Sequence, residues 1–208
     1  MNKKLIILLL IISSCPSFAQ DRTPLKNHTE LKKKMIKQSK ETTSIVSDFT
    51  QEKHVSFMKE PQISNGKFYY SQHDKMRWEQ QAPFNYVLLI NDGNVRIKDN
   101  GKEKNIKGAN KMMGIINKLM LGLINGQIFE NKDFITNYFT SNDFYIVELI
   151  PNNKRLKGII NTIELTFSKK TSRLKTLTFY EKSGDKSVMK FFNDKFNTTI
   201  KPSIFNTI

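Results

Sequence analysis

The side chains best suited to catalysis are few and scattered in this sequence. His28, His54 and His73 fall at a predicted helix start, in a predicted strand and in a turn, and nothing in their spacing brings them together. Asp48 and Glu52 share one face of a predicted strand, about 13 Å apart at the usual rise per residue, which is too far to share a proton. No Gly-x-Ser-x-Gly elbow, phosphate-binding glycine loop or His-Glu-x-x-His pair occurs in the chain. We therefore expect no enzyme activity, while an envelope hydrolase or a sugar-binding module stays open as an alternative.

Metal and disulfide chemistry are limited as well. The chain has a single cysteine, Cys15, so it can form neither an intrachain disulfide nor a cysteine-based zinc site. We expect no metal site. The stability of the protein must then come from its apolar core.

Residues 1–19 have the three-part layout of a secretory signal peptide. A short basic start is followed by an unbroken run of leucine and isoleucine, and then by small residues that end at Ala19. Cleavage after Ala19 would make Gln20 the first residue of an exported, periplasmic chain. The alternative is a lipobox at residues 12–15, in which an acylated Cys15 anchors the protein to a membrane.

The charge of the chain is strongly positive. Its 34 Lys and Arg residues against 19 Asp and Glu residues give a formal net charge of +15, and loss of Lys3 and Lys4 with the leader would leave +13 (15 minus 2). Such a balance favours anionic partners. Because the chain is predicted to be exported, we expect anionic lipid head groups and no nucleic acid. Simple solvation of abundant surface lysines is the alternative explanation.

Residues 20–208 are expected to form one domain built mainly from strands. The apolar period is helical over residues 27–42, with Asn27 or Thr29 as the helix cap. From Ser44 onward the period is two, and the turn sequences at residues 91–94 and 100–101 predict hairpins. Further strands are expected at residues 134–140, 144–150, 159–167, 173–181 and 187–192. The pattern predicts an antiparallel sheet with an N-terminal helix.

A second helix is predicted at residues 110–125, and its composition is unusual. It contains nine large apolar residues, with Lys111 and Lys118 as its only charges. The apolar surface is too wide for an ordinary half-buried helix. Residues alone leave two interpretations open: a helix buried in the core, or a mobile lid whose methionines adapt to an apolar ligand.

Several short motifs follow one another along the chain. They are residues 47–51 (SDFTQ), 64–68 (SNGKF), 75–79 (KMRWE), Pro83 and 91–94 (NDGN), followed by 149–151 (LIP), 163–167 (IELTF) and the terminal strand into Phe196, Asn197 and Phe205. Together, behind an export signal, they resemble the LolA-like outer-membrane lipoprotein carriers. The resemblance covers about residues 29–205.

This resemblance implies a mainly β (α+β) fold, an unclosed antiparallel β-barrel or half-barrel covered by a helical lid, with an N-terminal helix. It implies a periplasmic chaperone that binds lipoprotein acyl chains in a hydrophobic cavity and carries them from the inner to the outer membrane. The implied partners are an inner-membrane ABC-type complex that loads the carrier and an outer-membrane acceptor, with no cofactor, no catalysis and a monomeric state. A LolA-like carrier or sensor of another envelope lipid is the alternative.

Residues 110–125 would form the lid of such a carrier. The side chains expected to contact lipid are Phe49, Phe68, Tyr70, Met76, Trp78, Leu88, Met113, Ile116, Leu119, Met120 and Leu123. One position departs from the family: a basic residue before a proline holds the lid shut in the known carriers, and here Gln72 and His73 take those places. Gln72 is expected to contact the lid by a hydrogen bond without charge assistance, which leaves the manner of closure open and favours the alternative lipid.

Overall fold

A single antiparallel sheet organises the computed structural model, which describes residues 22–72, 74–82, 84–104 and 111–208. Its twelve strands follow the order β1-β8-β9-β10-β11-β12-β2-β3-β4-β5-β6-β7. The strands are β1 (Thr23–Pro24), β2 (Ser44–His54), β3 (Gln62–Ser71), β4 (Lys75–Ala82), β5 (Tyr86–Asn91), β6 (Asn94–Asp99), β7 (Lys102–Lys104), β8 (Phe134–Thr140), β9 (Phe144–Pro151), β10 (Ile160–Ser168), β11 (Leu174–Glu181) and β12 (Lys186–Phe196). Since no pairing among the described residues joins β1 to β7, the sheet is unclosed.

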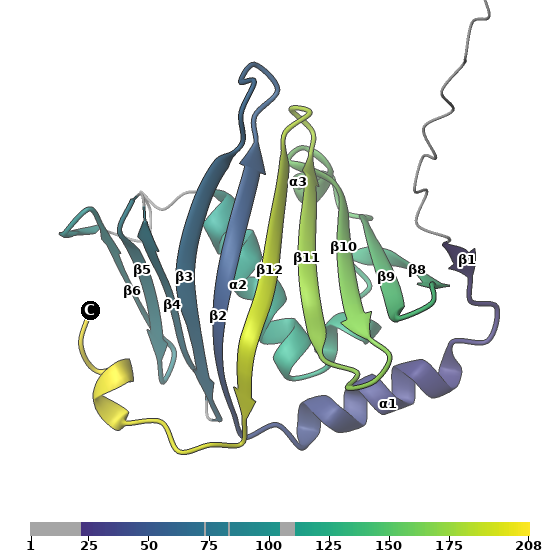
Figure 1. The fold of residues 1–208 in the computed structure, drawn as a ribbon, viewed down its shortest axis with the longest axis horizontal. Coiled ribbons are helices and arrows are strands. Elements are labelled where there is room, and N and C mark those ends of the chain that lie inside the picture. The colour runs from purple at the N-terminus through teal and green to yellow at the C-terminus, as the bar shows by residue number, and fades with distance from the viewer. Residues whose placement is uncertain (1–21, 73, 83, 105–110) are drawn as a thin grey trace, which may run out of the picture.

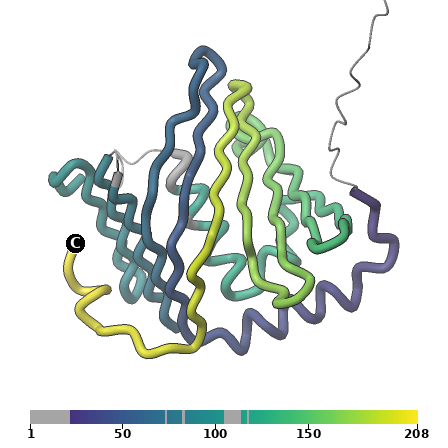
Figure 2. Tube along the Cα trace, in the orientation of Figure 1, coloured from purple at the N-terminus to yellow at the C-terminus, as the bar shows by residue number. Residues whose placement is uncertain are grey.

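Helices cover one face and one end of this curved sheet (Figure 1). They are α1 (Thr29–Lys40), α2 (Lys111–Ile124), α3 (Lys154–Lys157) and the short 3-10 helices η2 (Gln127–Glu130) and η3 (Pro202–Phe205). The trace in Figure 2 shows α2 behind the strands and α1 across their lower end. The expected half-barrel, covered by a helix and preceded by an N-terminal helix, is confirmed.

Amphipathicity fixes α1 against the sheet. Leu31 and Met35 are its buried residues, Glu30 lies in the first turn, and Lys37 and Lys40 lie in the last. Acids at the start and bases at the end of a helix both stabilise it through the helix dipole. The cap differs from the sequence prediction, because His28 takes the N-cap position without a side-chain bond and its ring stacks on Tyr138 with centroids 4.3 Å apart.

Tight hairpins set the register of the strands on the β4–β7 side. Asp92 and Gly93 have φ values of 48° and 79°, and Asn100 and Gly101 have values of 47° and 79°. Two consecutive positive φ angles are the backbone of a type I′ turn, which matches the twist of the paired strands. Both hairpins predicted from the sequence are therefore present.

The leader lies outside the described residues. The predicted signal peptide 1–19, Gln20 and the alternative anchor at Cys15 all fall in that part. In the described part of the chain, no helix has both the length and the apolarity that crossing a bilayer requires.

Candidate functional site

An aromatic cluster forms the centre of the face that α2 covers. Phe68 lies opposite Trp78 in the β3–β4 pair, and Phe49 lies opposite Phe191 in the β2–β12 pair. The rings of Phe49 and Trp78 are 4.2 Å apart between centroids, and Trp78 meets Phe68 and Phe191 at 6.0 and 6.4 Å with rings close to perpendicular. Tilted and edge-on contacts at these distances are favourable between aromatic rings.

A glycine makes this cluster possible. Gly66 lies opposite Phe49 in the β2–β3 pair. A Cβ at this position would lie 2.3 Å from the Phe49 ring and 2.2 Å from the carbonyl oxygen of Glu79. The Phe49 ring thus occupies the space that any side chain at position 66 would need.

The lipid-contacting residues expected from the sequence lie on one face of the sheet and on the helix over it. Those from the strands are Phe49, Phe68, Tyr70, Met76, Trp78 and Leu88, and those from α2 are Ile116, Leu119, Met120 and Leu123; all ten belong to one buried cluster with exposures of 8% or less. The side chain of Met113 lies outside the described residues. The strand face chosen from the sequence is therefore the face that packs against α2.

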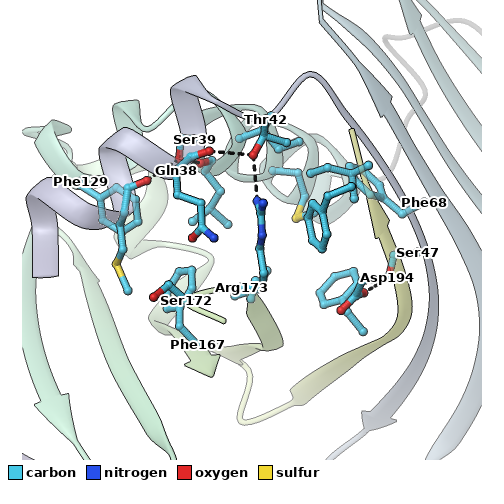
Figure 3. A pocket seen from close by; sticks show the side chains of 18 residues that line it. Gln38, Ser39, Thr42, Ser47, Phe68, Phe129, Phe167, Ser172, Arg173 and Asp194 are labelled. Carbon is cyan, nitrogen blue, oxygen red and sulfur yellow. Dashed lines mark hydrogen bonds between the residues drawn. The ribbon is translucent and has the colours of Figure 1, made fainter. Parts of the chain in front are cut away.

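A pocket opens beside this cluster, between α1, the end of α2 and the sheet (Figure 3). Its volume is about 100 Å³. Most of the side chains around it are apolar; the lining consists of Met35, Gln38, Ser39, Thr42, Ile45, Ser47, Phe68, Met120, Leu123, Ile124, Phe129, Phe167, Ser172, Arg173, Leu174, Phe191, Asp194 and Phe196. Three of the expected residues, Phe68, Met120 and Leu123, reach it, while the other seven pack in the closed part of the cluster.

The rest of the pocket wall was not found from the sequence. Met35 comes from α1, Phe129 from η2, Phe167 from β10 and Phe191 from β12. Periodicity does place Met35, Phe167 and Phe191 on an inward face, whereas Phe129 lies in a segment for which no element was predicted. Their meeting at one point depends on pairings between distant strands, for which short-range spacing gives no signal.

Polar side chains gather at one end of the pocket. The Arg173 guanidinium donates to the Thr42 hydroxyl at 2.8 Å and lies over the Phe196 ring at 3.7 Å. Burial lowers the pKa of Arg173, while the nearby Asp194 and Glu41 carboxylates oppose that shift. Among the described residues Arg173 forms no ion pair within 4.0 Å, and the hydrogen bond to Thr42 is the one described for its guanidinium.

Two further groups complete this polar end. Asp194 accepts hydrogen bonds from Ser47 and from Lys175, which compensates its charge. Ser172, only 3% exposed, has a buried hydroxyl without a partner among the described residues. Near Thr42, the Ser39 hydroxyl lies 3.0 Å from the Met35 carbonyl and 3.1 Å from the Leu123 carbonyl, and so links α1 to α2 (Figure 3).

Gln72 lies in the turn after β3. Its backbone amide donates to the carbonyl of Thr43 at 2.9 Å. Within the described part of the chain, no hydrogen bond joins the Gln72 side chain to α2. The only polar link described between the two helices is instead the Ser39–Leu123 contact.

Groups suited to metal binding do not gather in the described residues. No set of three His, Cys, Asp or Glu side chains there could hold a metal ion. Asp48 is bound to Lys67 and Asn193, and Glu52 to Lys190, which lowers the pKa of both carboxyls. Both carboxylates are thus engaged in surface contacts on the sheet.

The family of the chain follows from a comparison with family models. The model described as "Outer membrane lipoprotein carrier protein LolA" matches residues 40–207, which include every strand from β2 to β12. The chain belongs to the LolA family. Curated proteins give no match to it.

Solved structures of similar arrangement are distant in sequence. A putative outer membrane lipoprotein-sorting protein domain from Vibrio parahaemolyticus is 12% identical, covers 84% of this chain and 97% of its own, and has a TM-score of 0.42. A DUF1329 family protein from Desulfovibrio piger is 11% identical over 88% and 97% of the two chains, with a TM-score of 0.47. MucB is 10% identical over 85% of this chain and 61% of its own, with a TM-score of 0.46.

Proposed function

We propose that this member of the LolA family is a periplasmic carrier of lipoprotein acyl chains. It would receive them from an ABC-type complex of the inner membrane and deliver them to an acceptor in the outer membrane. The carrier would act as a monomer and without catalysis or cofactor. The export signal expected from the sequence supports a location between the two membranes.

The apolar layer between the concave sheet face and α2 carries this proposal. Ten of the eleven expected side chains lie in that layer, and α2 brings few charges to it. Separating such an apolar helix from the sheet costs much free energy when water enters the space between them. The cost is low when a hydrocarbon chain fills that space instead. The pocket at the end of α2 is the natural point for such a chain to enter.

The size of the pocket argues for movement on binding. A cavity of about 150 Å³ holds one benzene molecule, and the pocket described here is smaller, at about 100 Å³. A fatty acyl chain is several times larger than benzene. Binding therefore requires α2 and α1 to move away from the sheet, as expected for a two-state lid that is closed without cargo and open with it.

The energetics favour such a carrier over free diffusion. Each buried methylene contributes about 0.8 kcal/mol of stabilisation. Burial of a whole lipoprotein anchor in an apolar host is therefore favourable by roughly tens of kcal/mol. A carrier must therefore keep the acyl chains out of water and still be able to open and release them at a membrane.

A second cargo is favoured by two observations. Gln72 stands where the family has a basic residue, and Arg173 adds a cation without a carboxylate partner to one end of the pocket. Both suit a carrier or sensor of another envelope lipid, with an anionic head group that Arg173 could meet. This alternative shares the fold and the movement of α2.

Mass spectrometry of the lipid that co-purifies with the exported protein tests these proposals. Acylated lipoprotein peptides would support the first cargo, and a free envelope lipid would support the second. A fluorescent acyl probe should bind with a 1:1 stoichiometry in either case. If the purified protein carries no lipid and does not bind the probe, both proposals would be contradicted.

A further inference from the structure

Three loops form a projecting surface at the end of the half-barrel opposite α1 (Figure 1). The β2–β3 loop, residues 55–61, rises furthest, and the β11–β12 loop, residues 182–185, stands beside it (Figure 2). The β9–β10 loop, residues 152–159, contains α3. We call these three loops together the tip.

Hydrogen bonds hold the loops of the tip together. The Ser56 amide donates to the Asp185 carboxylate at 3.0 Å, which joins the β2–β3 and β11–β12 loops. The Lys182 amide donates to the Ile159 carbonyl at 2.9 Å, which joins the β11–β12 and β9–β10 loops. The tip is therefore one connected surface, although its parts are far apart in the sequence.

Large apolar side chains are exposed at the tip. Phe57 is 86% exposed and Met58 is 41% exposed, both in the β2–β3 loop, and Ile63 on the adjoining part of β3 is 56% exposed. Single exposed apolar residues are common on protein surfaces, but neighbouring ones on a protruding segment mark interaction sites. Phe57 and Met58 lie outside the apolar core, so they are free to meet a partner.

Basic side chains surround these apolar residues. The three loops contain Lys59, Lys154, Arg155, Lys157 and Lys182, all exposed, against the two acids Glu60 and Asp185. None of the five cations forms an ion pair within 4.0 Å among the described residues. Asp185 already accepts from the Ser56 amide, which lowers the pKa of its carboxyl. The tip thus presents unpaired positive charge.

We propose that the tip docks the protein onto an anionic lipid bilayer. Phe57 and Met58 enter the boundary between head groups and acyl chains, while the cations of α3 and Lys182 meet lipid phosphates. Aromatic and long apolar side chains flanked by lysine and arginine are typical of interfacial membrane contacts. A convex tip suits a deformable bilayer better than a second protein, which would need a matching groove.

Membrane docking at the tip is separate from the carriage of cargo. The tip is formed by loops, whereas the pocket lies near the other end of the strands, between α1 and α2. Membrane docking can therefore be measured without any acyl chain in the pocket, and its failure would leave the proposed cargo untouched.

Vesicle flotation of the full chain tests the proposal, with Cys15→Ser in every protein so that acylation cannot mediate binding. The vesicles are pure phosphatidylcholine or a mixture with phosphatidylglycerol. We expect binding to the anionic vesicles only. Since a cation near an anionic surface changes binding about fivefold, neutralising Lys154, Arg155 and Lys157 to Gln should weaken it at least about tenfold. Phe57→Ser with Met58→Ser should weaken it about tenfold as well.

Matched variants elsewhere on the surface provide the controls. Lys33, Lys34 and Lys40 of α1 changed to Gln give the same net charge as the α3 variant, and Phe192→Ser removes an apolar residue that is 42% exposed. Both should bind anionic vesicles like the parent protein. Equal losses in the α1 and α3 variants would overturn the proposal, because net charge alone would then explain binding. So would a parent protein that binds neither type of vesicle.

Discussion

At the scale of single residues, Gly66 decides whether the aromatic cluster can form. Gly66→Ala would force a Cβ into the Phe49 ring and the Glu79 backbone, which lie 2.3 and 2.2 Å away from it. Because the Glu79 oxygen belongs to the backbone and cannot rotate aside, we expect a loss of about 3 kcal/mol in the free energy of unfolding. Denaturant unfolding followed by circular dichroism measures this loss.

Gly114 in α2 is the matched control for that substitution. A Cβ at this position meets no described atom within 4 Å. Gly114→Ala should therefore stabilise the helix by about 1 kcal/mol or less, because alanine loses less backbone entropy than glycine. If Gly66→Ala were as stable as the parent protein, the ring packing described for Phe49 would be wrong.

Tyr86 gives the protein a dependence of stability on alkaline pH. Burial raises the pKa of Tyr86 from 10.0 to about 12, and its hydroxyl has no partner among the described residues. Between these two values the unfolded chain has lost the Tyr86 proton and the folded chain keeps it. Ionisation of Tyr86 therefore leaves the free energy of unfolding unchanged below pH 10 and lowers it as the pH rises toward 12.

Tyr86→Phe should reduce the loss of stability between pH 10 and pH 12. The variant should be at least as stable as the parent protein at neutral pH, because it removes a buried hydroxyl that lacks a hydrogen bond. Denaturant midpoints measured from pH 8 to 12 compare the two proteins. Other buried tyrosines with raised pKa values, such as Tyr138, keep some of the slope in both. An unchanged slope in the variant would show that Tyr86 ionises alike in both states.

At the scale of elements, regular periodicity made most of the sheet predictable. The strand predicted at residues 134–140 is β8 to the residue, and the helix predicted at residues 110–125 is α2, which ends one residue earlier at Ile124, while Asn110 lies outside the described residues. One missed strand and one strand predicted too short have physical reasons. β1 has only two residues and exists through its pairing with β8, and β12 extends to Phe196 beyond a register shift after Phe192 that interrupts the period of two.

The bulge in β12 also explains why the polar end of the pocket could not be predicted. Asn193 has a φ of 54°, and the extra residues turn Asp194 toward Ser47 and Lys175. A strict alternation through this strand would assign its side chains to the wrong faces. The sequence therefore predicted the side chains of the apolar layer, but it gave no signal that Asp194 and Arg173 line the pocket.

The role of α2 as a lid can be tested by a charge in its buried face. Leu119 is 3% exposed within the apolar layer. In Leu119→Glu an ionised carboxylate would lack a partner both in the closed layer and in a layer filled by an acyl chain, so we expect lipid uptake to be impaired while the sheet stays folded. Binding of an acyl probe should fall at least tenfold, which corresponds to a loss of about 1.4 kcal/mol or more in the free energy of binding. Probe titration and far-ultraviolet circular dichroism measure the two effects.

The neighbouring Lys118→Glu variant is the control, because Lys118 is exposed on the same helix. It introduces the same side chain and should bind the probe like the parent protein. Loss of the β-sheet signal in Leu119→Glu would mean that α2 is a fixed part of the core, and the lid assignment would fail.

At the scale of the whole molecule, the proposed cargo binding requires α1 to separate from the end of α2. The pocket lies between these two helices, and Ser39 of α1 contacts the Leu123 carbonyl. The backbone then turns at Gly126, whose φ is 76°, and comes back toward α1. A Cβ at Gly126 would lie 3.4 Å from the Ser39 Cβ, close to the range of about 3.5–4.5 Å seen in disulfides.

A disulfide between Ser39→Cys and Gly126→Cys, in a chain that also carries Cys15→Ser, should hold the pocket closed. The oxidised protein should not take up the acyl probe, and the reduced protein should bind it again, because reduction lets the two helices part. The Gly126→Cys variant controls for the strain of a side chain at the positive φ of residue 126, and the Ser39→Cys variant controls for the loss of the Ser39 hydroxyl. Equal uptake by the oxidised and reduced proteins would mean that the chain enters elsewhere, and the pocket between α1 and α2 would then not be the entrance to the apolar layer.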